Sequence, residues 1–149
     1  MIHNLSETGI KGLTLFNRFF NPDIDIQKKE LVASDVFSSS TDASMNLRWI
    51  AIMSKHVKCD LAASTGIHNS QSVIKQLLAG ATAVQVVSAI YKNGTSCISQ
   101  FISELSLWME KNKYEYISDF RGQMSQEKLQ NPEIYERTQF MKYFSSRTN

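Results

Sequence analysis

The sequence contains little that would mark a membrane, secreted or metal-binding protein. No apolar run approaches the roughly 20 residues that a helix needs to cross a bilayer, and the first residues, MIHNLSETGI, lack the charged and apolar regions of a signal peptide. The two cysteines, Cys59 and Cys97, and the histidines His3, His56 and His68 have neither disulfide-framework nor metal-ligand spacing. We therefore expect a cytoplasmic protein without a metal site, in which both thiols are small core residues.

The chain also has little net charge. Lys and Arg number 16 against 14 Asp and Glu, which gives a formal net charge of +2 and a pI near 8.5. The basic residues are spread among acidic ones, without the basic runs and interleaved aromatic residues of a nucleic-acid surface, so we expect no nucleic-acid partner. A chain of 149 residues, 42% of them hydrophobic, can bury one globular core, and nothing indicates a second domain.

Short apolar segments alternate with helical patterns along the chain. The first part of the chain should form the last turns of a helix in 1–9, a strand over 12–16, a turn-rich loop in NPDID and an extended piece near 31–36. The middle should form a helix around 47–54, the strand CDLAAS, a helix ending at Gly80 and the strand AVQVV. A short helix SAIYKNG, a long helix over 96–112 and two shorter helical pieces in the tail should follow. Because parallel neighbours need a crossover, this alternation predicts the α/β class.

Helical spacing identifies the residues that should face the core. The candidates on the three longer helices are Leu47, Ile50, Ala51 and Ser54, then Val73, Ile74, Leu77 and Leu78, then Cys97, Ile98, Phe101, Ile102, Leu105, Trp108 and Met109. Asp42 or Ser44 could cap the first of these helices, and Asn69 or Ser70 the second.

Polar and small residues follow each expected strand. Asn17, the pair Thr65 and Gly66, and Ser88 come directly after the three strands, and parallel strands collect such residues on one face, where ligands bind. The amide of Gly66 and the hydroxyl and amide of Ser88 could hold a phosphate. Ordinary turn chemistry explains a single Thr-Gly pair equally well. His68, beside the pair, could touch an anion, cap a helix or face solvent.

Three segments together resemble the C-terminal half of the dihydroorotate dehydrogenase family, in particular a bacterial dihydroorotate-dehydrogenase-like branch: GLTLFNRF, AASTGIHNSQSVIKQLLAGATAVQVVSAIYKNG and FRGQMSQ. The resemblance implies a (β/α)₈ barrel that binds FMN and oxidises dihydroorotate, or a related substrate, by hydride transfer to the flavin. It implies that Thr65 and Gly66, with Val87 and Ser88, hold the FMN phosphate. It also implies that Asn17 binds the small-molecule substrate.

Some residues depart from the family pattern. Thr65 and Val87 stand where the family has glycines, and the Ser-rich SSSTDAS replaces a glycine-rich loop. Arg18 replaces a small hydroxyl residue, and it could bind a carboxylate bidentately or pair with Asp23 or Asp25. These departures bear on whether dihydroorotate itself is the substrate.

The length of the chain implies that part of the barrel is absent. A (β/α)₈ barrel takes about 250 residues, so we expect this chain to hold the last three βα units plus C-terminal helices, as one partial domain over 1–149. The family's general base then lies in the missing half, no catalytic residue is expected here, and the chain alone should be inactive. A homo-oligomer or pairing with the missing N-terminal half would cover its open strand edges.

Three functional hypotheses follow. The chain is the FMN-phosphate half of a dihydroorotate dehydrogenase-type oxidoreductase, the phosphate-binding half of another barrel enzyme, or a truncated non-enzymatic fragment.

Overall fold

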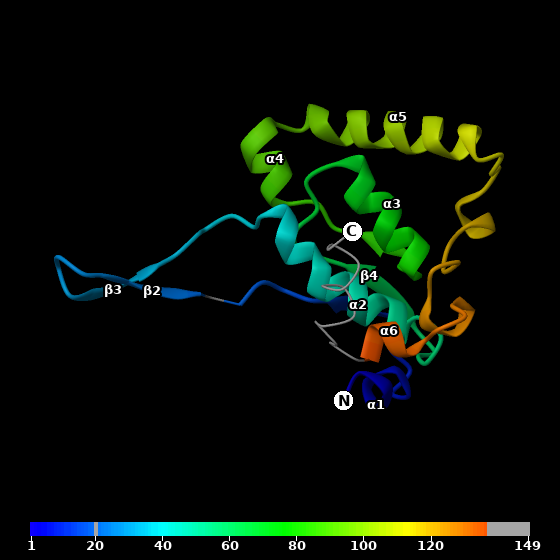
Figure 1. Ribbon diagram of the computed structural model, residues 1–149, viewed down its shortest axis with the longest axis horizontal. Helices are drawn as coiled ribbons and strands as arrows, with labels where there is room; N and C mark the ends of the chain where they lie inside the picture. The colour runs from blue at the N-terminus through cyan, green and yellow to red at the C-terminus, as the bar shows by residue number, and fades with distance from the viewer. Residues whose placement is uncertain (20, 137–149) are drawn as a thin grey trace, which may run out of the picture.

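The computed structural model describes residues 1–19 and 21–136 (Figure 1). The helices are α1 (Ile2–Ser6), α2 (Ala43–Met53), α3 (Ser70–Ala79), α4 (Ser88–Asn93), α5 (Ser96–Lys111) and α6 (Glu133–Glu136), with 3₁₀ turns at η1 (Ser40–Asp42), η2 (Ile117–Asp119) and η3 (Gln126–Lys128). The strands are β1 (Gly12–Leu15), β2 (Pro22–Asp25), β3 (Glu30–Ala33), β4 (Asp60–Ala63) and β5 (Ala83–Val84). Among these residues no helix combines the length and apolar character that crossing a membrane requires.

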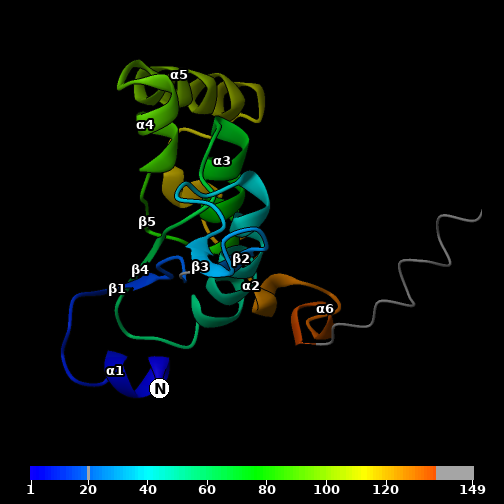
Figure 2. The same cartoon turned by 90° about the vertical axis from the view of Figure 1, so that its left-hand side faces the viewer.

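A three-stranded parallel sheet organises the body of the molecule. Its strand order is β1-β4-β5, and β1 runs beside β4 from Gly12 opposite Asp60 to Leu15 opposite Ala63. Figure 2 shows α2 and α3 on one side of this sheet, as crossover connections require. The α/β class expected from the sequence is confirmed.

The two faces of the sheet differ in burial. On the helix side, Leu15, Leu61 and Ala63 pack with Ile50 and Ala51 of α2 in one fully buried cluster. The opposite face is small and polar, and it carries Thr14, Ala62, Ala83 and Gln85. The amide of Gln85 finds a partner there, since its Nε2 lies 3.5 Å from the Thr14 hydroxyl. Among the described residues, β1 and β5 each have a strand on one side only.

The caps of the longer helices follow the sequence signals in part. The Asn69 side chain accepts a hydrogen bond from the Ser72 amide at 2.8 Å, which caps α3, and Gly80 ends that helix in a left-handed conformation with φ +119°. Asp42 precedes α2 without capping it. Asp42 is instead the last residue of the turn η1, and its carboxylate accepts a hydrogen bond from the Ser39 amide, which precedes that turn, at 2.8 Å.

One loop prediction was wrong, and one predicted strand is shorter than expected. The segment NPDID is strand β2, which pairs antiparallel with β3 and begins at Pro22, a position where a missing amide donor is tolerated. Ser34 donates to the Asn21 carbonyl at 3.0 Å and closes the base of this hairpin. The strand in AVQVV covers only Ala83 and Val84, because the chain turns into α4 at Ser88.

The β2–β3 hairpin forms an arm that leaves the body of the molecule. Figure 1 shows it extending away from the helices and the parallel sheet. Its apolar side chains, Ile24, Ile26 and Leu31, are largely exposed.

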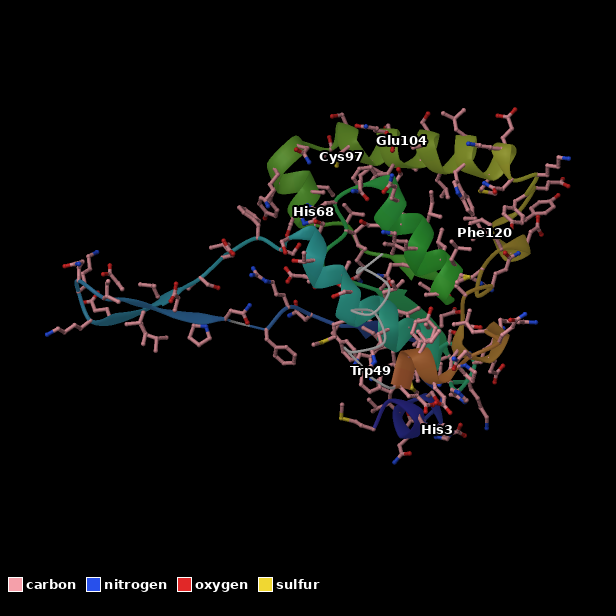
Figure 3. The ribbon with its side chains drawn as sticks, in the orientation of Figure 1. His3, Trp49, His68, Cys97, Glu104 and Phe120 are labelled. Carbon is pink, nitrogen blue, oxygen red and sulfur yellow. The ribbon has the colours of Figure 1, made fainter. Side chains whose placement is uncertain are left out.

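Helix α5 lies across α3 (Figures 1 and 3) and joins it through a polar contact as well as an apolar one. Cys97 and Phe101 are buried beside Ala89, as the helical spacing predicted, whereas Ile102 is 60% exposed because no described element covers that side of α5. At the start of α3 the Ser70 hydroxyl donates to the Glu104 carboxylate, and Gln100 Nε2 donates to the same carboxylate at 2.8 Å.

This polar contact should make stability depend on pH. The hydrogen bonds from Ser70 and then Gln100 lower the pKa of Glu104 from its ordinary value of 4.5. A lowered folded-state pKa gives stability that is present above the unfolded pKa and lost as the pH falls through the folded pKa. We expect Glu104→Gln to flatten the loss of stability that the wild type shows as the pH falls through and below 4.5, measured as urea midpoints. Glu110→Gln replaces an exposed side chain of the same helix and should leave the dependence of the urea midpoint on pH as it is in the wild type. Equal pH dependence of the wild type and both variants would contradict this prediction.

The segment after α5 returns to the end of α3. Gly122 donates to the Leu77 carbonyl at 3.0 Å and Met124 to the Leu78 carbonyl at 2.8 Å, while Phe120 is fully buried between Trp108 and Tyr114. The two helical pieces expected here are short 3₁₀ turns and the four-residue helix α6, which begins directly after Pro132. The rest of the second expected piece, residues 137–149, lies outside the described residues.

Candidate functional site

The carboxyl ends of β1, β4 and β5 surround a pocket of about 200 Å³. All five residues that the sequence predicted for a site, Asn17, Thr65, Gly66, Val87 and Ser88, line it. Whole ligands usually occupy pockets of about 300–1,000 Å³, so this pocket has the size of one part of a larger site.

The loop after β4 has the backbone of a glycine pair. Thr65 has φ +75° and Gly66 has φ +79°, and a positive φ at a β-branched residue such as Thr65 is a genuine outlier. The Thr65 hydroxyl turns back to donate to the Phe16 carbonyl at 3.0 Å. A Cβ on Gly66 would lie 2.3 Å from the Ala43 amide nitrogen, so the loop depends on glycine to approach α2 this closely.

Val87 and Ser88 form the opposite wall of the pocket. Val87 is 59% exposed and its carbonyl starts α4, accepting from Ile90 at 2.9 Å. Because α4 has only six residues, its dipole adds little to anion binding. The polar group that this loop directs into the pocket is the Ser88 hydroxyl.

At the end of β1, Asn17 is exposed and uses its Oδ1 to accept from the Arg18 amide at 2.9 Å. The Arg18 side chain does not pair with Asp23 or Asp25. Its Nη1 donates to the carbonyls of Asp35 and Phe37, and its Nε lies 3.7 Å from the Asp42 carboxylate. The hairpin carries Asp23 and Asp25 away from the body, which is why this pairing was wrong.

Sequence reasoning missed Ser38, which lies at the centre of the pocket's hydrogen bonds. Its hydroxyl is 3.3 Å from the Gly66 amide, 3.0 Å from the Ser88 hydroxyl and 3.1 Å from His68 Nε2. His68 is thus neither a helix cap nor a free side chain, and Figure 3 shows it close to the start of α2 and to α4. The Ser-rich loop was the available signal, but its sequence does not distinguish one serine from the next.

A second missed residue, Asn46, ties two strand ends together. It is buried on α2, where its Nδ2 donates to the carbonyls of Ser64 and Thr65 and its Oδ1 accepts from the Phe16 amide at 3.3 Å. Its position one turn before the buried Ile50 was the only sequence signal. Asn46 therefore fixes the Thr65 loop against the end of β1.

One further pocket, of about 250 Å³, borders this site and shares Asn17, Arg18 and Thr65 with it. A larger apolar one of about 460 Å³ is lined by Met1, Ile2, His3, Phe16, Phe19, Met45, Trp49 and Met53 and contains none of the predicted site residues. No group of three or more His, Cys, Asp or Glu side chains suited to a metal ion occurs in the part of the chain described.

The similarity to known proteins is consistent along most of the chain. Residues 1–109 match the family model of dihydroorotate dehydrogenase. The catalytic subunit of dihydroorotate dehydrogenase B (NAD(+)) from Petrotoga mobilis is 27% identical over 125 residues, which cover 82% of this chain and 41% of that protein. Dihydroorotate dehydrogenase A (fumarate) from Lactococcus lactis is 37% identical over 59 residues, 40% of this chain and 19% of that protein.

Solved structures share the fold. The dihydroorotate dehydrogenase of Eimeria tenella in complex with ferulenol superposes with a TM-score of 0.64 at 22% identity, over 78% of this chain and 32% of that one. The chain spans at most about two fifths of these relatives. The family match over more than two thirds of its length establishes that the chain belongs to the dihydroorotate dehydrogenase family.

Proposed function

We propose that residues 1–149 are the C-terminal part of a (β/α)₈ barrel, comprising its last three βα units and the helices that follow. Three parallel strands with helices on one side support this, as does the share of each relative that the chain covers. The small and polar open face of the sheet would then face the barrel interior. A partner that supplies the remaining strands, or a second copy of this chain, would pair with the open edges of β1 and β5.

The function proposed for this part is to hold the phosphate of FMN in a dihydroorotate dehydrogenase-type oxidoreductase. One observation carries the proposal: the Gly66 amide and the Ser88 hydroxyl approach the same point, at 3.3 and 3.0 Å from one oxygen atom, that of Ser38. A phosphate oxygen at that point would meet both groups, so the donor set fits the anionic end of FMN. Thr65 and Val87 would contribute backbone amides to the same phosphate site, and we call these four residues, Thr65, Gly66, Val87 and Ser88, the cradle.

The substrate would lie towards Asn17, whose amide group lines the same pocket from the end of β1. FMN, when bound, supplies the acceptor for a hydride from dihydroorotate or a related small molecule. The residues of this chain would bind and orient, because the general base of the family is proposed to lie in the absent part of the barrel. The isolated chain is therefore proposed to be inactive, and family membership speaks against a barrel enzyme of another class.

The test is flavin retention, read from the visible absorbance spectrum after FMN is added and the protein is desalted. We expect the chain co-expressed with the N-terminal half of the barrel to retain FMN. Ser88→Ala should weaken binding about tenfold, the factor that one hydrogen bond of about 1.4 kcal/mol contributes. Ser103→Ala, an exposed hydroxyl on α5, is the matched control.

The chain alone should be measured in parallel. Retention of FMN without the N-terminal half would mean that the cradle is preformed. A colourless protein in both preparations would contradict the proposed function.

A further inference from the structure

One hydroxyl group already occupies the point where the cradle's polar groups meet. Ser38 is buried, only 6% exposed, and its Oγ accepts from the Gly66 amide and donates to Ser88 Oγ, while His68 Nε2 lies within hydrogen-bond distance. The Ser38 amide donates to the same Ser88 oxygen at 3.0 Å. Residues 35–38, which we call the strap, therefore cross the cradle and close it from one side.

The strap is held at both sides of the pocket by contacts that do not involve the cradle. Arg18, from the end of β1, donates to the carbonyls of Asp35 and Phe37. From α4, Lys92 Nζ lies 3.4 Å from the Ser38 carbonyl and 5.9 Å from the Phe37 ring centroid, and Tyr91 packs on that ring at 5.5 Å. These contacts with Arg18, Tyr91 and Lys92 therefore position the Ser38 hydroxyl in the cradle.

Movement of the strap would break these anchors but would leave both buried hydrophobic clusters intact, because neither contains a strap residue. Towards the N-terminus the strap continues into the β2–β3 hairpin, whose side chains extend away from the body in Figure 3. Phe37 and Val36 are exposed, and within the strap Ser38 alone is buried.

We propose that Ser38 is an internal competitor for the phosphate cradle: its hydroxyl takes the place of a phosphate oxygen, and an anion binds only by displacing it. This inference rests on the proposed function. The Gly66 amide has a single hydrogen, which it donates to the Ser38 oxygen at 3.3 Å, so a phosphate oxygen can accept that hydrogen bond only in place of Ser38. An anionic oxygen accepts charge-assisted hydrogen bonds, which are stronger than those to a hydroxyl, so displacement is favourable once the anion is present.

The test is a titration of the 149-residue chain with inorganic phosphate, followed by the NMR signal of the Gly66 amide. Ser38→Ala removes the competing hydroxyl and should bind phosphate about tenfold more tightly, the factor for one net hydrogen bond. Ser38→Thr keeps the hydroxyl and should bind like the wild type. The matched control is Ser40→Ala, an exposed serine two residues further on.

A second readout needs no ligand. The Gly66 amide should exchange its hydrogen faster in Ser38→Ala than in the wild type, because it loses its acceptor. Equal or weaker phosphate binding by Ser38→Ala, with FMN still retained by the wild type co-expressed with the N-terminal half, would overturn the competitor role and leave the proposed function standing. If phosphate perturbed Gly66 in no variant and the co-expressed protein also retained no FMN, both would fall together.

Discussion

Gly66→Ala should lower the free energy of unfolding by about 2–5 kcal/mol. Part of this cost comes from the positive φ of Gly66, which is unfavourable for alanine by about 1–2 kcal/mol. The rest comes from overpacking, worth about 1–3 kcal/mol, because the new Cβ would lie 2.3 Å from the Ala43 nitrogen and 2.8 Å from its Cα. These are atoms of the backbone at the start of α2, which cannot rotate away. Urea denaturation followed by circular dichroism measures the change.

Gly9→Ala separates the two contributions. Gly9 also has a positive φ, at +84°, but nothing lies within 4 Å of the position that its Cβ would take. This control should lose only about 1–2 kcal/mol. A loss at Gly66 no larger than that at Gly9 would mean that the loop and α2 do not approach as closely as described. The folded fraction of Gly66→Ala should also bind FMN more weakly, since the amide that faces the pocket shifts with the loop.

Asn46→Ala is the second substitution with a large expected effect, about 3 kcal/mol of destabilisation. It leaves the carbonyls of Ser64 and Thr65 and the amide of Phe16 without their present partner. An unsatisfied buried polar group costs about 1–3 kcal/mol, and water entering the space left by the side chain offsets part of the sum. Thermal and urea unfolding should agree on the size of the loss.

Asn112→Ala is the matched control for this substitution. Asn112 also donates from its Nδ2 to a main-chain carbonyl, that of Trp108 at 2.7 Å, but it is exposed at the end of α5. Water can replace the lost bond there, so the change should stay below about 1 kcal/mol. Flavin retention should also differ between the two variants: Asn46→Ala should retain less FMN than Asn112→Ala, because only Asn46 fixes the Thr65 loop. Equal retention by both variants would contradict the positioning role of Asn46.

The regular elements were predictable where apolar periodicity and turn chemistry agree. The strands β1 and β4, the core face of α2 and the Asn69 cap of α3 were each expected from a few neighbouring residues. The hairpin was missed because the turn residues Asn21 and Pro22 indicate a loop, and because its strands pair only with each other and bury little. Ile102 was expected in the core because periodicity shows which face of a helix is apolar and not what covers it.

The five predicted site residues come together because parallel strands deliver their carboxyl ends to one edge. Their role in binding FMN stays a prediction, as does the cytoplasmic location. Ser38 and Asn46 could not be found in the same way. Their partners lie between 18 and 50 residues away in the sequence, and nothing local in a Ser-rich loop or on a helix specifies contacts at that range. Each depends on how α2 and α4 pack beside the strand ends.

The hairpin arm is closed at its base by the hydrogen bond between Asn21 and Ser34, so its length is nearly independent of the rest of the fold. Doubling the length of a flexible loop costs only about 0.6 kcal/mol in closure entropy. Insertions or deletions at the tip of the arm should therefore be tolerated, with the strap and β1 left in place. In evolutionary terms the arm is free to change its surface rapidly while the strand ends beneath it stay fixed.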